Sequence, residues 1–383
     1  MKEFISYFSP VPNEIINFEW QATQIGFLID KHTENYIPTL GSQSIVIFNI
    51  PEYEGSENII DDSHCYVRRA FYQLHQQKMP SITDLGTLNL MSTRKESFEV
   101  IQKVITVLLE KNIIPIVLGG GHDITYAVYR AYADIKKYVS LTVVDKNFDI
   151  GLEEDKLASH SYFGKIMRHN PSYLFHYTNI GYQTHFVSPA ATKMLNKMNF
   201  DLMRLGNVKS NFIDVEPAMR NTDFLSFDIS AIQSFVSSAN IYASPNGLTS
   251  EESCKIMHYA GLSDKLSAVG LFEYGQTMDN NFQTSHLLAQ MIWYFIEGYK
   301  FRKNELTPNL KNCIRYTVAF EDGKNIIVFY KSQLSGRWWM GVPFKNDKNE
   351  VQNYFVACSY SDYETANSGE VPDRWLKTYN KFI

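Results

Sequence analysis

Acidic or imidazole side chains directly follow three apolar, strand-like runs of the chain. They are His122 in "PIVLGGGHD", Asp145 and Asp149 in "LTVVDKNFD", and Asp228 in "FLSFDIS". Three Asp side chains that meet in one crevice repel one another unless they are protonated or neutralised by a cation. A divalent metal ion is the simplest neutraliser, and carboxylate and imidazole groups are suitable ligands for it. The combination therefore predicts a metal site.

Each of these segments also has a simpler interpretation. A Gly run after a strand often only makes a tight turn in which the His caps a helix, and a single Asp at a strand end is more often a helix cap than a ligand. "GGGHD" matches neither a phosphate-binding P-loop nor the GxGxxG dinucleotide fingerprint. Ile150 and Lys156 stand where a calcium loop requires Gly and Glu, which excludes an EF-hand.

The surrounding segments predict how these residues are positioned. Short β-rich apolar runs alternate with longer amphipathic segments, a rhythm typical of a parallel sheet covered by helices. The predicted helices span 96–112 and 285–300, and the predicted strands span 44–50, 113–118, 138–145, 173–181, 224–230 and 266–274. Ligands in such folds bind outside the carboxyl ends of the strands, so the four side chains are expected to meet there.

The last part of the chain has a different residue pattern. After about residue 305, alternating aromatic runs surround the turn-like "EDGKN" (321–325), which predicts a small antiparallel appendage. We therefore expect an α/β domain over 1–304 and a β-rich extension over 305–383. The Arg and Trp residues of the extension have two interpretations. The first is a small hydrophobic core, and the second is a protein-binding surface. These residues are Arg337, Trp338, Trp339, Arg374 and Trp375.

Composition narrows the class of protein. The 383 residues include 36 basic and 41 acidic side chains without a Lys/Arg block, so nucleic acid is not expected as a partner. The first 20 residues do not resemble a signal peptide, and no run of 18 apolar residues follows, so we expect a cytoplasmic protein with no membrane contact. The four cysteines are far apart, as expected for reduced thiols.

The motifs together resemble the arginase or ureohydrolase superfamily, and its formiminoglutamase-like (formimidoylglutamase) branch in particular. The resemblance rests on "GGGHD", DxxxD after a strand, "SFD" after another, "NGLTSEE" and "GLFEYG", and it covers roughly residues 40–300. It implies a three-layer α/β/α sandwich on a mainly parallel eight-stranded sheet, and a homo-oligomer. It also implies two Mn²⁺ ions and a bridging hydroxide that attacks a guanidinium, amidine or formimino carbon.

The resemblance also assigns metal ligands, and the chain matches only half of them. The first ion would take His122, Asp145, Asp149 and Asp228. The second ion would also need a His and a further Asp at positions where this chain has Asn147 and Ser230. An amide and a hydroxyl are neutral, weak ligands, so we expect one bound Mn²⁺ and a doubtful second ion.

Two further residues have family counterparts. Glu273 in "LFEYG" matches the carboxylate that holds the substrate nitrogens, although a strand-end salt bridge is the alternative. His160 lies where arginase-like enzymes have a proton-shuttling His, and a loop His bonded to backbone is the alternative.

Two hypotheses about function remain open at this stage. The first is a metal-dependent hydrolase acting on linear C–N bonds of formiminoglutamate-like or guanidino substrates, with an impaired or single-metal site. The second is a catalytically inactive arginase-fold pseudoenzyme that binds a small molecule or a protein, with the extension as its interface.

Overall fold

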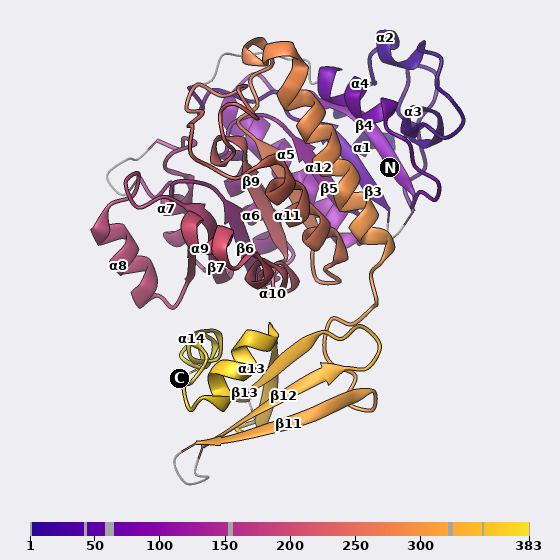
Figure 1. Ribbon diagram of the computed structural model, residues 1–383. Helices are drawn as coiled ribbons and strands as arrows, with labels where there is room; N and C mark the ends of the chain where they lie inside the picture. The colour runs from indigo at the N-terminus through magenta and orange to yellow at the C-terminus, as the bar shows by residue number, and fades with distance from the viewer. Residues whose placement is uncertain are drawn as a thin grey trace.

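The computed structural model describes residues 2–41, 44–57, 65–151, 156–320, 325–346 and 348–382. Figure 1 shows a large part, built around one sheet, and a small part formed by the C-terminal residues. Among the described residues, no helix is long and apolar enough to cross a membrane.

The large sheet has ten strands in the described part of the chain, and eight parallel strands form its main body, the number that the family resemblance implies. Their spatial order is β4-β3-β5-β10-β9-β6-β7-β8. Their bounds are β3 Ile45–Asn49, β4 Ile82–Leu88, β5 Ile114–Leu118, β6 Val139–Val144, β7 Leu174–Tyr182, β8 Asp201–Arg204, β9 Phe224–Asp228 and β10 Ala268–Phe272. Two short strands, β1 (Phe8–Ser9) and β2 (Asp30–Lys31), extend the sheet beside β4, and β1 runs antiparallel to it.

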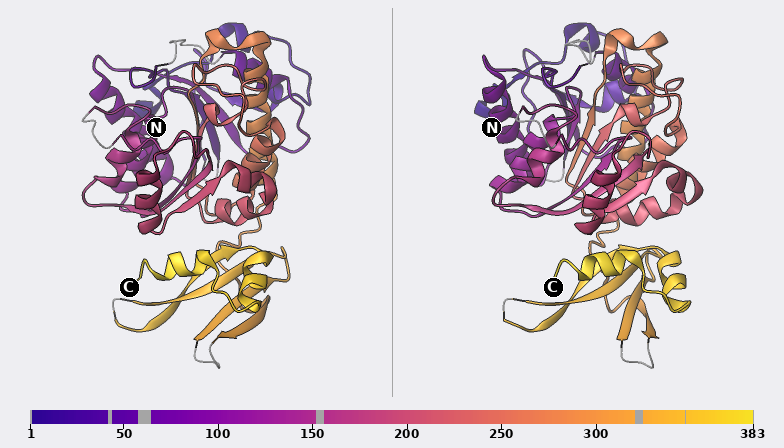
Figure 2. Two further views of the ribbon diagram at one scale, coloured as in Figure 1. Left: turned by 60° about the vertical axis from the view of Figure 1, so that its left-hand side comes forward. Right: turned by 90° about the vertical axis from the view of Figure 1, so that its left-hand side faces the viewer.

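Helices cover both faces of this sheet. The face that packs on Val46 and Phe48 of β3 carries α5 (Arg94–Glu110), α6 (Ile124–Asp134), α7 (Tyr162–Met167) and α8 (Pro189–Lys197). The opposite face, which packs on Ile45 and Ile47, carries α4 (Cys65–Gln73), α9 (Leu205–Ser210), α10 (Val215–Arg220), α11 (Ser250–Leu262) and α12 (Gln283–Lys300). Successive side chains of β3 thus enter opposite cores, as pleating requires. The result is the three-layer sandwich (Figure 2).

Shorter helices complete the large part of the molecule. At the N-terminus these are α1 (Lys2–Ile5), α2 (Asn13–Ile16) and α3 (Ile25–Leu28). Single 3₁₀ turns occur at Phe212–Asp214, Ile229–Ala231, Gln276–Met278 and Asn280–Phe282.

Local sequence explains where the main helices start. At the start of α5, the Thr93 side chain accepts a hydrogen bond from the Glu96 backbone N–H, and the Glu96 side chain accepts one from the Thr93 backbone N–H. Thr249 and Glu252 form the same reciprocal capping box at the start of α11, within the "NGLTSEE" segment. Each box satisfies two backbone N–H groups that the first helical turn leaves unpaired.

The C-terminal part is a four-stranded antiparallel sheet with two helices. Its strands are β11 (Cys313–Phe320), β12 (Asn325–Ser332), β13 (Trp338–Lys345) and β14 (Val351–Cys358), in that spatial order. The helices α13 (Tyr360–Asn367) and α14 (Asp373–Tyr379) follow the sheet. The antiparallel sheet confirms the β-rich extension, and the two helices add to it. The predicted turn 321–325 lies, apart from residue 325, outside the described residues.

The aromatic residues of the extension are largely internal. Trp338 packs with Phe329 and Met340 in a small core, and Trp339 is 1% exposed. The Trp339 ring lies against the Arg220 guanidinium of the large part. These two Trp side chains therefore serve packing rather than an exposed surface. The predicted division at residue 304 falls in the segment between α12 and β11 and stays a prediction.

The extension docks at the amino-terminal edge of the large sheet. Arg220 and Asn221, just before β9, bond to backbone carbonyls of Trp338, Cys358 and Ala357. At the start of β8, Asp201 forms an ion pair with Lys377 of α14 at 3.0 Å. The carboxyl-terminal edge, where ligands are expected, is left to the loops of the large part.

Candidate metal centre

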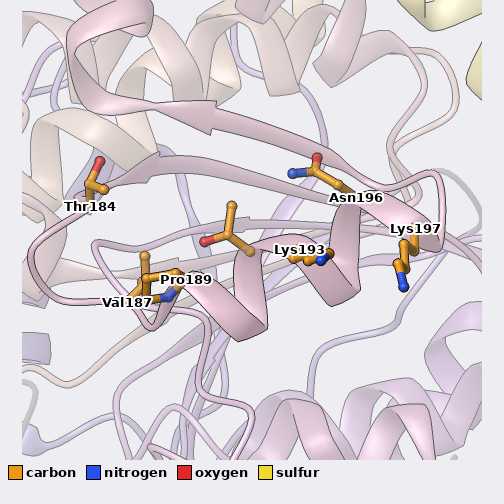
Figure 3. Close-up of a pocket in the computed structure, with 7 residues that line it drawn as sticks. Thr184, Val187, Pro189, Lys193, Asn196 and Lys197 are labelled. Carbon is orange, nitrogen blue, oxygen red and sulfur yellow. The ribbon is translucent and has the colours of Figure 1, made fainter.

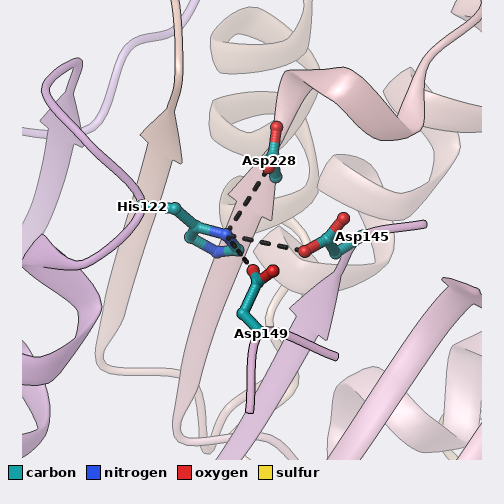
Figure 4. A group of neighbouring side chains, drawn as sticks. All are labelled: His122, Asp145, Asp149 and Asp228. Carbon is teal, nitrogen blue, oxygen red and sulfur yellow. Dashed lines mark ion pairs between the residues drawn. The ribbon is translucent and has the colours of Figure 1, made fainter. Parts of the chain in front are cut away.

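His122, Asp145, Asp149 and Asp228 meet at the carboxyl ends of the central strands (Figure 4). Two glycines after β5, Gly119 and Gly120, have φ of 79° and 74°, a conformation that glycine adopts without strain. A Cβ on Gly120 would lie 2.7 Å from the Glu52 carbonyl oxygen, so the turn that delivers His122 also requires a small residue. The glycine run therefore positions the imidazole.

The four side chains are close enough to share one ion. The Nδ1 atom of His122 lies 3.2 Å from Asp149 Oδ2, 3.6 Å from Asp228 Oδ2 and 3.7 Å from Asp145 Oδ2. One ligand atom from each residue falls within 4.8 Å of all the others. Figure 4 shows the three carboxylates arranged around this one nitrogen.

Neighbouring hydroxyl groups orient the imidazole. His122 Nε2 lies 2.9 Å from Ser226 Oγ and 3.2 Å from the Tyr162 hydroxyl. The opposite nitrogen, Nδ1, is buried and has no hydrogen-bond partner, and neither has Asp145 Oδ2. Buried polar atoms without partners are rare and call for a missing ligand. A metal ion bound by Nδ1 and the carboxylates would satisfy both atoms, so the residues fit a divalent cation.

The pKa values of the cluster's carboxyl groups also indicate a cation site. Burial, followed by the neighbouring Asp149 carboxylate, raises the pKa of Asp145 well above its usual range. Burial is also the largest cause that raises the pKa of Asp149 to about 8, and burial with the Asp145 charge raises the pKa of Asp228 to about 7. Each shift reflects the cost of an uncompensated buried charge, which a bound cation would remove.

Asn147 and Ser230 take part in the cluster through their backbones. The Asn147 N–H donates to Asp145 Oδ1 at 3.0 Å, and the Ser230 N–H donates to Asp228 Oδ1 at 2.6 Å. These bonds hold the carboxylates of Asp145 and Asp228, which the family resemblance would have a second ion share with the first. The Asn147 carbonyl in turn accepts a bond from Asn179 at 2.8 Å. Neither residue adds a carboxylate or an imidazole to the cluster.

Glu273 lies beside the cluster and directly contacts one of its members. It is 4% exposed, and its Oε1 accepts hydrogen bonds from the His122 backbone N–H at 2.7 Å and from the Ser159 hydroxyl at 2.6 Å. Its Oε2 accepts a bond from Ser56 at 2.7 Å. Its backbone φ of 67° is in the left-handed region, which is unusual for a glutamate and places the side chain at this turn after β10.

His160 is not a member of the cluster. Its side chain is exposed, on the loop between Ser159 and Ser161. A proton-shuttling role for His160 stays a prediction.

Sequence reasoning did not identify Ser226 or Tyr162, the two partners of His122. Ser226 precedes Asp228 by two residues on β9, so the alternation of a strand places both side chains on one face, and that signal could have found it. Tyr162 comes from α7, and no spacing in the sequence connects it with His122.

A separate pocket of about 640 Å³ lies next to the carboxyl end of β7 (Figure 3). It contains none of the four cluster residues. It is lined by Thr184, Val187, Pro189, Thr192, Lys193, Asn196 and Lys197.

Solved structures with the same architecture come from several organisms. A formiminoglutamase from Trypanosoma cruzi with Mn²⁺ has a TM-score of 0.61 at 20% identity, over 67% of this chain and 94% of that chain. A formimidoylglutamase from Bacillus subtilis has a TM-score of 0.65 at 17% identity, over 75% and 95%. A proclavaminate amidino hydrolase from Streptomyces clavuligerus has a TM-score of 0.57 at 16% identity, over 69% and 94%. At these identities, the likeness establishes the fold.

A comparison with curated proteins gives no match. A family model, by contrast, matches residues 53–297, which is more than half of the chain and includes all four cluster residues together with Glu273. The chain belongs to the arginase family.

Proposed function

We propose that this protein is a metal-dependent hydrolase of linear C–N bonds that uses a single Mn²⁺ ion. The observation that carries the proposal is the convergence of His122, Asp145, Asp149 and Asp228, with the imidazole Nδ1 buried among three carboxylates and without a hydrogen-bond partner. These four residues would hold the ion. Membership of the arginase family, and the Mn²⁺ with which the similar Trypanosoma cruzi formiminoglutamase was crystallised, support this choice of metal.

The chemistry divides between the ion and the chain. When bound, a divalent ion lowers the pKa of a coordinated water and so makes a nucleophile available near neutral pH. Ser226 and Tyr162 keep the imidazole oriented by bonding to Nε2, so that Nδ1 faces the ion. Without the second set of ligands, this activation is weaker than at a two-metal site.

Glu273 is the residue we assign to the substrate. Hydrogen bonds from Ser56, Ser159 and the His122 backbone hold its carboxylate in place beside the cluster. A carboxylate fixed in this way is a strong acceptor for the charged N–H groups of an amidine or guanidinium. Glu273 would thereby place the electrophilic carbon of that group next to the metal centre.

A formimino or guanidino compound is the substrate class that fits this arrangement. Water adds to its electrophilic carbon, the C–N bond to the amine breaks, and the amine leaves with a proton. A formimino amino acid would yield formamide and the free amino acid, and a guanidino compound would yield urea and an amine. The names of the similar structures, two formiminoglutamases and an amidino hydrolase, support this class.

The second candidate function is an inactive arginase-fold protein that binds a ligand without turnover. Asn147 and Ser230, which stand where a second ion would need a His and an Asp, favour it. The two candidates share the metal site and differ only in turnover.

The deciding experiment measures metal content and activity on the same purified protein. We expect one Mn²⁺ per chain by elemental analysis, and release of formamide or urea from at least one compound in a panel of formimino and guanidino substrates. Asp228→Asn should lose the metal and the activity, and Glu273→Gln should lose activity while it keeps the metal. Asp373→Asn, on a side chain that is 89% exposed, is the matched control. If the protein binds the metal but forms no product from any compound, the hydrolase proposal is wrong and the inactive arginase-fold protein is the function that remains.

A further inference from the structure

Lys146 lies inside the metal-binding segment and is almost completely buried. It directly follows Asp145 and precedes Asn147, and it is 4% exposed. A lysine is rarely buried without an anion beside it, because removing an ammonium group from water costs free energy. Within the described part of the chain, however, no carboxylate forms an ion pair with Lys146. Its positive charge must therefore be balanced by groups at longer range.

Neutral groups hold the ammonium group of Lys146 in place. Its Nζ donates a hydrogen bond to the Tyr242 carbonyl. The same atom lies 5.1 Å from the centroid of the Phe186 ring and 6.0 Å from that of the Tyr242 ring. A carbonyl and two aromatic faces attract a cation but carry no net charge. They fix the position of the ammonium group without neutralising it.

The segment that holds Lys146 also reaches the residues around the metal cluster. The Tyr242 N–H donates to Asn240 Oδ1 at 2.6 Å, and the Asn240 side chain donates to the Glu273 carbonyl at 3.0 Å. Covalent geometry limits how far the ammonium group can be from the cluster. The Cα atoms of Lys146 and Asp145 are roughly 3.8 Å apart and a lysine side chain reaches roughly 6 Å further, so Nζ stays within about 10 Å of the Asp145 Cα atom.

The charge of Lys146 acts on the cluster at this range. Burial is the largest influence on the Asp149 carboxyl and raises its pKa to about 8, whereas the Lys146 charge acts in the opposite direction. Two unit charges roughly 10 Å apart still interact inside a protein, where the effective dielectric constant is about 20 rather than about 80. Lys146 therefore favours the ionised form of Asp149, as a bound cation would.

The charges of the site change together with the missing ligands. In the two-ion arrangement that the family resemblance implies, four carboxylates balance two divalent ions. Here Ser230 stands in place of the fourth carboxylate, and the three of Asp145, Asp149 and Asp228 remain. One divalent ion leaves one negative charge of these three unbalanced, and one ammonium group balances it. Glu273 is outside this count, because its charge is assigned to the cationic substrate.

We propose that the ammonium group of Lys146 takes the place of the second divalent ion as the charge partner of the metal cluster. The proposal rests on the single-ion site of the proposed function, and it does not depend on turnover. It relates the substitutions at Asn147 and Ser230 to a third residue of the same segment. It also means that Lys146 opposes the binding of further positive charge, so its removal should tighten Mn²⁺ binding.

The test compares Mn²⁺ affinity among variants of Lys146 in the full-length protein. Lys146→Gln removes the charge and can still donate to the Tyr242 carbonyl, Lys146→Met removes both, and Lys146→Arg keeps the charge. Calorimetric titration is done at pH 8.5, where Asp228 is ionised and Asp149 largely so, and few of their protons leave when the ion binds.

The two neutral variants should bind Mn²⁺ about tenfold more tightly than the unaltered protein, and Lys146→Arg should bind it equally well. Tenfold corresponds to about 1.4 kcal/mol, the interaction of two unit charges roughly 12 Å apart at an effective dielectric constant of about 20. Lys345→Met is the matched control, because it removes the same charge from an exposed side chain of the extension. It should leave the affinity unchanged.

A second ion gives an independent readout. When Lys146→Gln is added to Asn147→His and Ser230→Asp, the second Mn²⁺ should bind about tenfold more tightly than in the variant that keeps Lys146. Elemental analysis at limiting Mn²⁺ should accordingly find more metal per chain in the triple variant.

The sign of the effect separates this proposal from a purely structural role of Lys146. If Lys146 only tethers Tyr242, its replacement would weaken Mn²⁺ binding or leave it unchanged. The proposal is overturned if the neutral variants bind Mn²⁺ no more tightly than the unaltered protein, or if Lys345→Met tightens binding as much. Lys146→Gln keeps a donor for Tyr242 and decides the matter even if Lys146→Met fails to fold.

The outcomes also distinguish this proposal from the proposed hydrolase function. Tighter binding by the neutral variants supports the role of Lys146 even if no compound is turned over, and only the hydrolase would then be wrong. If the unaltered protein binds one ion and the neutral variants bind it no better, only the role of Lys146 is wrong. An unaltered protein that binds no Mn²⁺ would overturn both.

Discussion

Manganese binding to this protein should release protons, in a number that falls as the pH rises. Metal ligands must be deprotonated to bind, whereas burial and mutual repulsion keep protons on the cluster when no cation is present. The pKa of Asp149 is raised to about 8 and that of Asp228 to about 7, and that of Asp145 is raised well above its usual range. The three carboxylates interact, so the protons belong to the cluster as a whole.

The expected number follows from these pKa values. Near pH 6.5, Asp149 is almost fully protonated and Asp228 about three-quarters so, which gives a release of between one and two protons per ion from these two residues, and the raised pKa of Asp145 adds to that number. Near pH 8.5, Asp228 is ionised and Asp149 largely so, and the release from these two residues falls well below one proton. The apparent affinity for Mn²⁺ should therefore rise steeply between these two pH values.

Calorimetric titration of Mn²⁺ in pairs of buffers with different ionisation enthalpies measures the proton count at each pH. A release of less than one proton near pH 6.5 would refute the reasoning, because it would mean that the carboxylates are already ionised without the metal.

The same pKa shifts determine how the stability of the metal-free protein depends on pH. Between about pH 4 and pH 7 the metal-free folded protein binds more protons than the unfolded chain, so its free energy of unfolding should fall as the pH rises, by about 1.4 kcal/mol per pH unit for each shifted carboxyl.

Three further changes test the neighbouring structure. Asn147→His combined with Ser230→Asp should raise the Mn²⁺ content by elemental analysis from one toward two ions per chain, and an unchanged content would contradict the assignment of these positions. Ser226→Ala removes the closer partner of His122 Nε2 and should weaken Mn²⁺ binding about 10- to 100-fold in titration calorimetry; equal affinity would mean that the hydroxyl does not orient the ring. Arg220→Met leaves three hydrogen bonds to the extension unmade and Glu216 unpaired, and should lower the free energy of unfolding in urea by about 3–5 kcal/mol, whereas Arg315→Met, on an exposed side chain, should have little effect.

The metal cluster was predictable because ligands in a parallel sheet are held at the carboxyl ends of its strands. Carboxyl ends of neighbouring parallel strands meet at one edge, and β5, β9 and β6 lie close together in the sheet although other elements separate them along the chain. His122, Asp145 and Asp228 each follow or end one of these strands. Strand order itself is not encoded in any local pattern, and no strand order was predicted from the sequence.

Contacts between distant segments were not predictable. The bond from the His122 backbone to Glu273 joins residues 151 positions apart, and the docking of Arg220 on Cys358 joins residues 138 apart. Neither has a local signature, since both depend on how whole elements pack. The helix α13, by contrast, begins with Ser359 and Asp362, a capping-box pair that the sequence displays, and attention to that pair would have found it.

The position of the extension also bears on the missing second-metal ligands. An added domain could in principle supply a carboxylate or imidazole to replace those that Asn147 and Ser230 lack. Here the extension contacts the amino-terminal edge, and the five residues of β9 separate that edge from Asp228 by roughly 16 Å. No side chain of the described part of the extension belongs to the cluster. The described part of the extension therefore supplies no further ligand. Under the function proposed above, a second ion would have to bind through the neutral amide and hydroxyl of Asn147 and Ser230, which is why we expect a single ion.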